Sequence, residues 1–183
     1  MSSITLRADC AQCAALCCVA LAFDRSALFA IDKAAGEPCQ NLSDLDRCTI
    51  HADRAAQGFA GCAGYDCLGA GQRVTAMFIG QSWRDGLRMA AAMFEAFSAM
   101  RKVNELMLLL RAAQKMPLEA AHRLRCDALL ARLDTDWTVE SLSAFAAADV
   151  SHDVMAFLAE LRGYAPSLRD TSCARRRAGR SCP

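Results

Sequence analysis

Residues 10–18 read CAQCAALCC, and this stretch decides the character of the N-terminal part of the chain. Eight of the chain's eleven cysteines lie within the first 67 residues. They are Cys10, Cys13, Cys17, Cys18, Cys39, Cys48, Cys62 and Cys67. Thiol groups at such short spacings either pair as disulfides in an oxidising compartment or bind a soft metal as thiolates in a reducing one.

The cysteine count and the chain length favour metal binding over disulfides. A secreted disulfide framework normally combines an even number of cysteines with a short chain and an export signal, whereas this chain has 183 residues and eleven cysteines. Residues 20–22 resemble a signal-peptide cleavage site, but cleavage there would remove half of the cysteine cluster. No stretch approaches the ~20 apolar residues of a membrane span. We therefore expect a cytoplasmic, metal-binding protein with no membrane partner.

The composition divides the chain into three parts. Residues 1–71 are rich in glycine and other turn formers, and they carry five basic and eight acidic side chains. Such a segment buries little apolar surface, so we expect its cysteines to stabilise it by binding a metal. Residues 72–165 show helical periodicity, and residues 166–183 form a basic tail that we expect to be disordered. The expected fold is mainly α: a cysteine-rich, metal-stapled segment followed by a helical bundle.

The bundle is expected to begin with one long helix. Apolar residues recur at helical spacing from about residue 82 to residue 115. Ser82 at its start, with Asp85 three positions later, has the pattern of a capping box.

Three further segments complete a bundle of three to four helices. Pro117 marks the start of the second helix, whose apolar face is expected to include Leu124 and Leu129. Residues 137–140 open a third helix and residues 151–162 form a fourth. Short links between such helices are typical of an antiparallel bundle.

The spacing of the cysteines predicts where metal ligands converge. If residues 9–23 are helical, Cys10, Cys13 and Cys17 lie at positions i, i+3 and i+7 and share one face. Zinc takes four ligands, commonly thiolates with or without a histidine, and iron–sulfur clusters also take four thiolates. The candidate ligands are Cys10, Cys13, Cys17, Cys18, Cys39, Cys48, Cys62, Cys67 and His51. Zinc is the preferred metal and an iron–sulfur cluster the alternative, in two sites or in one site with additional structural thiols.

Neighbouring residues add three expectations about this site. The adjacent Cys17 and Cys18 are expected to point in different directions, and so not to chelate a single ion together. Arg7, Arg47 and Arg54 are expected to offset part of the negative charge of a thiolate site. Buried unreactive thiols are the alternative to any metal, because free cysteine also behaves as a small hydrophobic residue.

The arrangement resembles the CxxCxxCC cysteine-cluster family, which is described as a zinc- or iron-chelating domain. The matching positions are Gly36, Cys39 and Leu42, then Cys48, Ile50 and His51, then Cys62 and Cys67. The opening cluster departs from the family name by one extra residue before the paired cysteines. This resemblance implies a metal site but no defined biochemistry.

A resemblance over nearly the whole chain is to the N-terminal regions of some actinobacterial pentapeptide-repeat proteins, although this chain lacks the repeats. The shared stretches are residues 16–21, 29–33 and 65–72. Flagellin lysine methylases resemble the same cysteine-cluster group. The resemblances therefore imply either a metal-binding protein with a structural or interaction role, or a metallocluster enzyme, methylase-like or redox, with an iron–sulfur centre.

Outside the cysteines, the sequence contains no local catalytic signature. His122 and Cys126 lie at i, i+4, which suits a metal, but with no other ligand nearby we expect a helix surface there. The arginine-rich tail lacks interleaved aromatic residues, so we expect no nucleic-acid partner. A protein partner and the oligomeric state stay open.

Overall fold

The computed structural model describes residues 4–147 and 150–164, so the tail at residues 166–183 lies outside the described part. The described residues are mainly α-helical, as predicted, and their extended segments pair only as isolated β-bridges. The α-helices are α1 (Leu16–Ala20), α2 (Ala60–Gly64), α3 (Ala70–Met77), α4 (Leu87–Ala113), α5 (Ala120–Leu133), α6 (Val139–Ala147) and α7 (Val150–Glu160). Short 3-10 helices are η1 (Cys10–Gln12), η2 (Trp83–Asp85) and η3 (Leu161–Tyr164).

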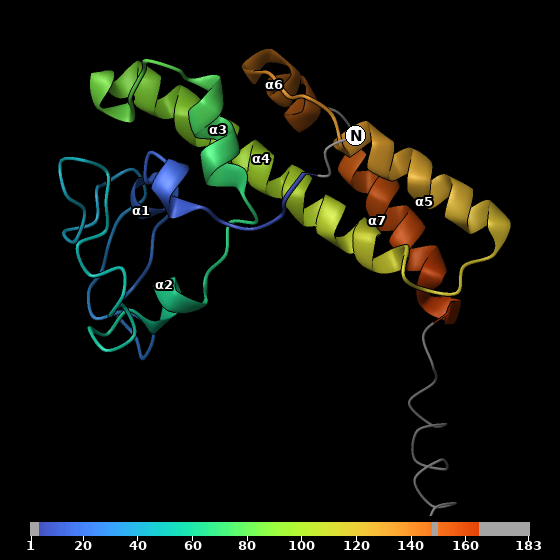
Figure 1. The fold of residues 1–183 in the computed structure, drawn as a ribbon, viewed down its shortest axis with the longest axis horizontal. Coiled ribbons are helices and arrows are strands. Elements are labelled where there is room, and N and C mark those ends of the chain that lie inside the picture. Colours follow the sequence, from blue (N-terminus) through green and yellow to red (C-terminus); the bar gives the residue numbers. More distant parts are fainter. Residues whose placement is uncertain (1–3, 148–149, 165–183) are drawn as a thin grey trace, which may run out of the picture.

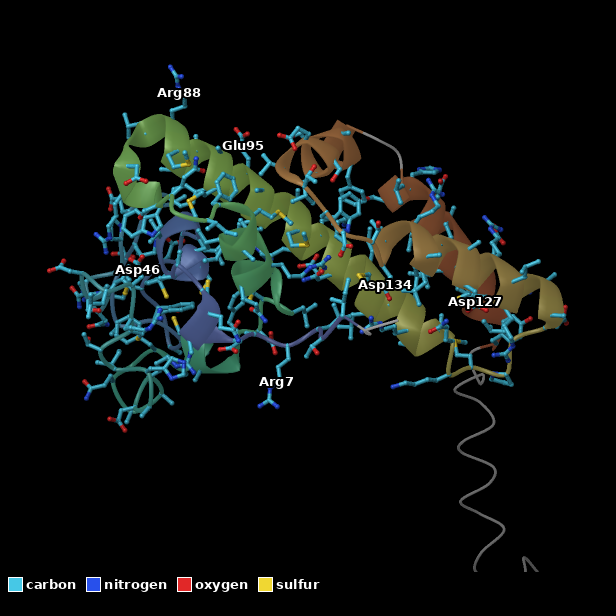
Figure 2. All side chains as sticks on the ribbon, turned by 45° about the horizontal axis from the view of Figure 1, so that its top comes forward. Arg7, Asp46, Arg88, Glu95, Asp127 and Asp134 are labelled. Atoms are coloured by element: carbon cyan, nitrogen blue, oxygen red, sulfur yellow. The ribbon has the colours of Figure 1, made fainter. Side chains whose placement is uncertain are left out.

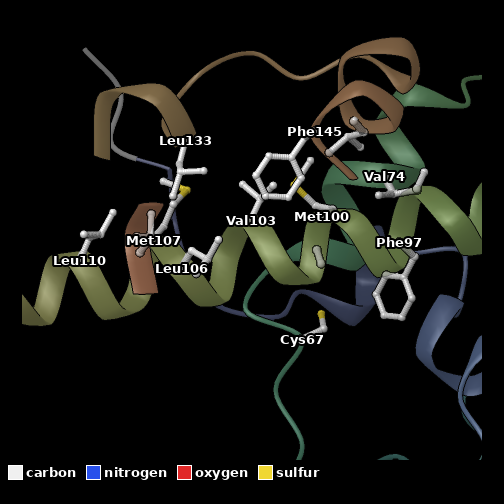
Figure 3. Packing of buried hydrophobic residues seen from close by; sticks show 14 of the residues in the cluster. Cys67, Val74, Phe97, Met100, Val103, Leu106, Met107, Leu110, Leu133 and Phe145 are labelled. Carbon is white, nitrogen blue, oxygen red and sulfur yellow. The ribbon is translucent and has the colours of Figure 1, made fainter. Parts of the chain in front are cut away.

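The 27-residue helix α4 is the element around which the others pack. Figure 1 shows it crossing the molecule, with α1, α2 and the N-terminal loops towards one end and α5 and α7 towards the other. In Figure 3, Leu133 and Phe145 lie on one side of α4, and Cys67 lies on the opposite side. One continuous apolar core therefore joins the cysteine-rich segment to the helical bundle.

The helices α5, α6 and α7 cover the bundle side of α4. Their buried anchors are Cys126, Leu129, Leu133, Leu142, Phe145, Val154 and Phe157. Two exposed ion pairs, Arg125–Glu160 (2.6 Å) and Arg132–Asp153 (2.9 Å), link α5 to α7. Among the described residues, no helix by itself has the length and apolar character needed to cross a membrane, and α6 with α7 meets that test only as a pair bent by 55°.

The predicted helix over residues 82–115 starts later than expected. Ser82 and Asp85 do form a capping box, but it caps η2. Gly86 then takes a φ of 115°, which interrupts the helical path, and α4 begins at Leu87. The second predicted helix also starts later, at Ala120 instead of near Pro117.

The prediction of one helix over residues 9–23 is wrong. Between η1 and α1, Ala15 takes the left-handed conformation with a φ of 55°. The backbone N–H of Ala14 donates to the hydroxyl of Thr75 (2.9 Å), and its carbonyl accepts from the indole of Trp83 (3.0 Å). These tertiary hydrogen bonds satisfy backbone groups that a continuous helix would pair internally, and they hold the break in place.

Candidate metal centre

A single cavity, here called the cysteine chamber, brings together every candidate ligand. Its volume is about 480 Å³. The candidate ligands that line it are Cys10, Cys13, Cys17, Cys18, Cys39, Cys48, Cys62, Cys67 and His51. The lining extends from the exposed Cys10 to Cys67, which is 8% exposed. All the cysteines within the described part of the chain are free thiols.

Side-chain hydrogen bonds fix the start of the chain beside the segment that carries Cys67. The N–H of Ala8 donates to the carboxylate of Asp66 (3.0 Å). The N–H of Asp9 donates to the side-chain oxygen of Gln72 (3.1 Å). Residues more than fifty positions apart in sequence are thereby held together, and the chain that leads into Cys10 is attached to the segment that carries Cys67.

A buried lysine ties the loop after residue 32 to α1. Lys33 is only 6% exposed. Its ammonium group donates to the backbone carbonyls of Val19 (2.9 Å), Ala34 (2.9 Å) and Glu37 (2.8 Å). Three bonds match the three donors of an ammonium group, so this cation is fully satisfied by the backbone. The N–H of Cys39, two residues after Glu37, donates to the carbonyl of Cys18 (3.1 Å). This bond is a further attachment of the same loop to α1.

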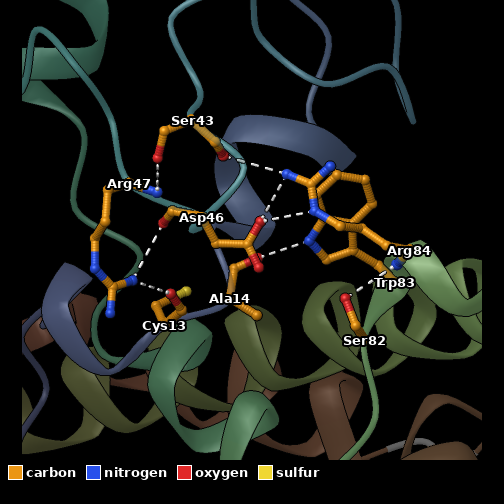
Figure 4. Close-up of polar contacts among 8 residues, drawn as sticks. All are labelled: Cys13, Ala14, Ser43, Asp46, Arg47, Ser82, Trp83 and Arg84. Carbon is orange, nitrogen blue, oxygen red and sulfur yellow. Dashed lines mark hydrogen bonds and ion pairs between the residues drawn. The ribbon is translucent and has the colours of Figure 1, made fainter.

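Two arginines hold the next loop against the cysteine segment (Figure 4). Arg84 donates to the carboxylate of Asp46 (3.0 Å), and its guanidinium lies 4.1 Å from the centre of the Trp83 ring. Arg47 donates to the backbone carbonyl of Cys13 (3.2 Å). The loop that precedes the sixth cysteine is therefore attached both to η2 and to the break between η1 and α1.

Two glycines allow close packing at the chamber wall. A Cβ atom on Gly71 would lie 2.5 Å from the Sγ atom of Cys13. A Cβ atom on Gly61 would overlap the ring of Phe29, which stacks on Phe23 with 4.4 Å between ring centroids. Glycine is needed at both positions because any side chain would displace a wall residue.

Burial keeps most of these thiols protonated when no cation is bound. It raises the pKa of Cys13 to about 11, although the N–H groups of Leu16 and Ala15 and the Thr75 hydroxyl act in the opposite direction. Burial likewise raises the pKa of Cys10, Cys48 and Cys62. Because a metal binds the thiolate form, metal binding at this chamber would release protons.

The adjacent thiols of Cys17 and Cys18 do not diverge as expected, because both line the chamber and their sulfur atoms lie 3.9 Å apart. The hydrogen bond between the two thiols lowers the pKa of Cys18, burial acts in the opposite direction, and the positive charges of Arg54 and Lys33 lower it further. The same hydrogen bond raises the pKa of Cys17. In the described part of the chain, no three His, Cys, Asp or Glu side chains are grouped as ligands of one metal ion.

Two residues that line the chamber each have a polar atom that is buried without a hydrogen-bond partner among the described residues. These atoms are the Nε of Arg54 and the hydroxyl of Tyr65. Arg54 still donates through another nitrogen to the carbonyl of Cys62 (3.2 Å), and burial raises the pKa of Tyr65. A buried unpaired donor costs about 1–3 kcal/mol, so each group would gain from an acceptor that reaches it.

The structure also locates the remaining predicted residues. Arg47 and Arg54 line the chamber as expected, whereas Arg7 points away from the molecule in Figure 2. Cys126, expected on a helix surface, is fully buried, and its thiol donates to the carbonyl of Leu110 at 3.5 Å. Tyr65 is not among the predicted site residues; its sequence signals are its position between the last two of the eight cysteines and its place at the start of the shared stretch 65–72.

Comparisons with known proteins give one relative and no family. No family model and no solved structure matches the chain. The chain is 44% identical over 109 residues to YybG of Bacillus subtilis (strain 168), whose name describes it as an uncharacterized protein. The match covers 59% of this chain and 39% of YybG, so the chain spans less than half of that relative's length.

Proposed function

We propose that the cysteine chamber binds a soft metal centre through thiolates, and that the protein is a cytoplasmic metal-binding module with a structural or interaction role. The observation that supports this proposal is the convergence of eight cysteines from distant positions on one cavity. Unreactive thiols have no reason to share a cavity, and they pack separately into apolar cores, as Cys126 does. Free thiols at this density also suit a reducing compartment.

The size of the chamber favours a centre with more than one metal ion. Thiolate sulfurs lie about 2.3 Å from zinc, so four of them close around one ion and leave no empty space. A volume of about 480 Å³ with eight thiols accommodates two zinc ions or an iron–sulfur centre. The rings of Phe23, Phe29 and Phe59 form an apolar part of the wall, which would limit the access of water to such a centre.

Metal analysis of protein purified anaerobically and without added metal tests this proposal. We expect zinc, or iron together with acid-labile sulfide. An iron–sulfur centre gives a brown protein that absorbs near ~400 nm, whereas zinc gives a colourless one. The variant Cys10→Ser/Cys13→Ser is expected to lose metal, and Cys126→Ala, in the α4–α5 core, is expected to retain it. Less than about half an equivalent of any transition metal in the wild type would overturn the proposal.

A second candidate function, a metallocluster enzyme, is favoured by the unpartnered atoms of Arg54 and Tyr65, two residues that line the same chamber. Together they offer hydrogen bonds to an anionic or oxygen-containing molecule beside the metal. Adding acetate or inorganic phosphate to the metal-loaded protein tests this. A spectral change that is lost in Tyr65→Phe would support an open position at the centre. Spectra that do not respond to either anion would overturn it.

A further inference from the structure

We propose that the eight thiols divide into two four-cysteine metal sites. The α3 set consists of Cys10, Cys13, Cys17 and Cys67, and the loop set consists of Cys18, Cys39, Cys48 and Cys62. This division rests on the proposed metal-binding function and goes beyond it, because it assigns each thiol to one of two centres. Four thiolates are the complement of one tetrahedral zinc ion or one iron–sulfur cluster, so each set is complete without the other.

Two members of the α3 set, Cys13 and Cys67, lie at the first turn of α3. A Cβ atom on Gly71 would lie 2.5 Å from the Sγ of Cys13 and 3.7 Å from the Sγ of Cys67, so both sulfurs lie at this turn. The bonds from Ala8 and Asp9 to the segment around Cys67 bring the chain that leads into Cys10 to the same place. The positive end of the α3 helix dipole stabilises negative charge there.

The loop set is assembled by backbone hydrogen bonds that do not involve α3. The N–H of Cys39 donates to the carbonyl of Cys18 (3.1 Å), which joins the loop to α1. Leu42 donates to the carbonyl of Cys39 (2.9 Å) and pairs with Cys48 in an isolated antiparallel bridge. Three cysteines separated by up to thirty positions are thereby connected through consecutive backbone contacts.

Positive side chains accompany the loop set and complete its assembly. Arg54 donates to the carbonyl of Cys62 (3.2 Å), which attaches the fourth cysteine of this set to the loop that follows Cys48. The ammonium group of Lys33 is bound to the carbonyl of Val19, directly after Cys18. Positive groups therefore lie beside both sets: the N-terminus of α3 and Arg47 beside the α3 set, and Arg54 and Lys33 beside the loop set.

The two sets meet at the adjacent residues Cys17 and Cys18. Their sulfur atoms lie 3.9 Å apart. The division assigns one thiol of this pair to each set, so the two centres are neighbours in the chamber.

Cadmium-113 NMR of the full chain tests the division, because cadmium replaces zinc at thiolate sites and its resonance reports the ligands of each ion. We expect the reduced, metal-free protein to take up two equivalents of cadmium and to give two all-thiolate resonances. Cys67→Ser should shift or remove one resonance, and Cys39→Ser should shift or remove the other. Cys126→Ala, which changes a thiol outside the chamber, should leave both resonances in place.

The outcomes separate a wrong division from a wrong function. A single resonance in the wild type, or loss of the same resonance in both serine variants, would overturn the division while metal binding itself stands. Simultaneous change of both resonances in each variant would show one joint centre and would also overturn it. Failure of the wild type to bind cadmium, zinc or an iron–sulfur cluster would overturn the proposed function, and the division with it.

Discussion

Gly71 and Cys13 lie so close together that a Cβ atom on the glycine would stand 2.5 Å from the cysteine sulfur. In Gly71→Ala, the added methyl group must displace the sulfur of Cys13 from its position at the first turn of α3. We expect this variant to lose metal while the α4–α7 bundle stays folded. Helix propensity cannot account for such a loss, because alanine favours a helix over glycine by about 1 kcal/mol. Metal analysis and circular dichroism measure the two effects.

Gly64→Ala is the matched control for this prediction. Gly64 is the last residue of α2, and a Cβ atom there would have no atom within 4 Å. We expect the Gly64→Ala variant to bind as much metal as the wild type. If Gly71→Ala and Gly64→Ala bind metal equally well, the contact between Gly71 and Cys13 is not needed for the site.

Replacing Lys33 by methionine should loosen the loop that carries Cys39. Methionine preserves much of the apolar stem but removes the three hydrogen bonds from the ammonium group to backbone carbonyls. We expect a loss of roughly 1–3 kcal/mol in the free energy of unfolding, because three hydrogen bonds from a charged donor are lost. Urea unfolding measures the change. Lys102→Met, at an exposed position on α4, should change stability by less than about 0.5 kcal/mol.

Asn104 should be important for both stability and metal content. It is fully buried in α4, where its side-chain oxygen accepts from Arg73 and its nitrogen donates to the carbonyl of Leu68 (2.8 Å). Leu68 has a φ of 54° and directly follows Cys67. We expect Asn104→Ala to lower the free energy of unfolding by about 1–3 kcal/mol, measured by thermal unfolding, and to lower the metal content. Ser98→Ala, exposed on the same helix, is the control, and equal behaviour of the two variants would contradict this role.

Helices α4 to α7 could be predicted from the sequence because apolar periodicity is a local property of the chain. The errors lie where local and tertiary preferences conflict. Alanine-rich residues 9–23 favour a helix by propensity, but the hydrogen bonds that join the Ala14 backbone to the side chains of Thr75 and Trp83 outweigh it. In α5, the sequence pattern places Leu124 on the apolar face, but Leu124 is 74% exposed. Cys126 is buried instead, because a free cysteine behaves as a small hydrophobic residue.

The candidate ligands could be named from their spacing, but their arrangement could not. Ala8 and Asp66 are 58 positions apart, and the bond between them helps to attach the chain that leads into Cys10 to the segment that carries Cys67. No local pattern indicates such a contact. The sequence also does not indicate that Tyr65 and Arg54 each have a buried polar atom without a partner, because this burial arises only when distant segments fold together.

Metal removal should affect the cysteine segment much more than the bundle. Residues 21–59, all within the described part of the chain, contain no helix and are held by turns and isolated bridges. Such a segment cannot offset its ordering entropy once a metal is lost. After chelation under reducing conditions, we expect hydrogen exchange to accelerate throughout residues 4–71 and to stay slow in α4 and α5. Equal protection of residues 4–71 with and without metal would contradict this.

Cys126 should behave as a core residue whose contribution depends on pH. Its thiol is fully buried, so we expect Cys126→Ser to lose about 1–3 kcal/mol and Cys126→Ala to lose less, since alanine buries no hydroxyl group. Both variants should keep their metal.

Burial raises the pKa of Cys126 above its ordinary value, so the folded protein holds this proton more tightly than the unfolded chain does. The stability contributed by the neutral thiol is therefore fully present below the unfolded pKa, and it is lost as the pH rises through the folded pKa. We expect the stability advantage of the wild type over Cys126→Ala to shrink between pH 7 and about pH 10. The difference between these two proteins isolates Cys126, because every other thiol is common to both. Urea unfolding measures this difference in stability between the wild type and Cys126→Ala. A difference that stays constant across this pH range would show that Cys126 does not ionise differently in the folded and unfolded states.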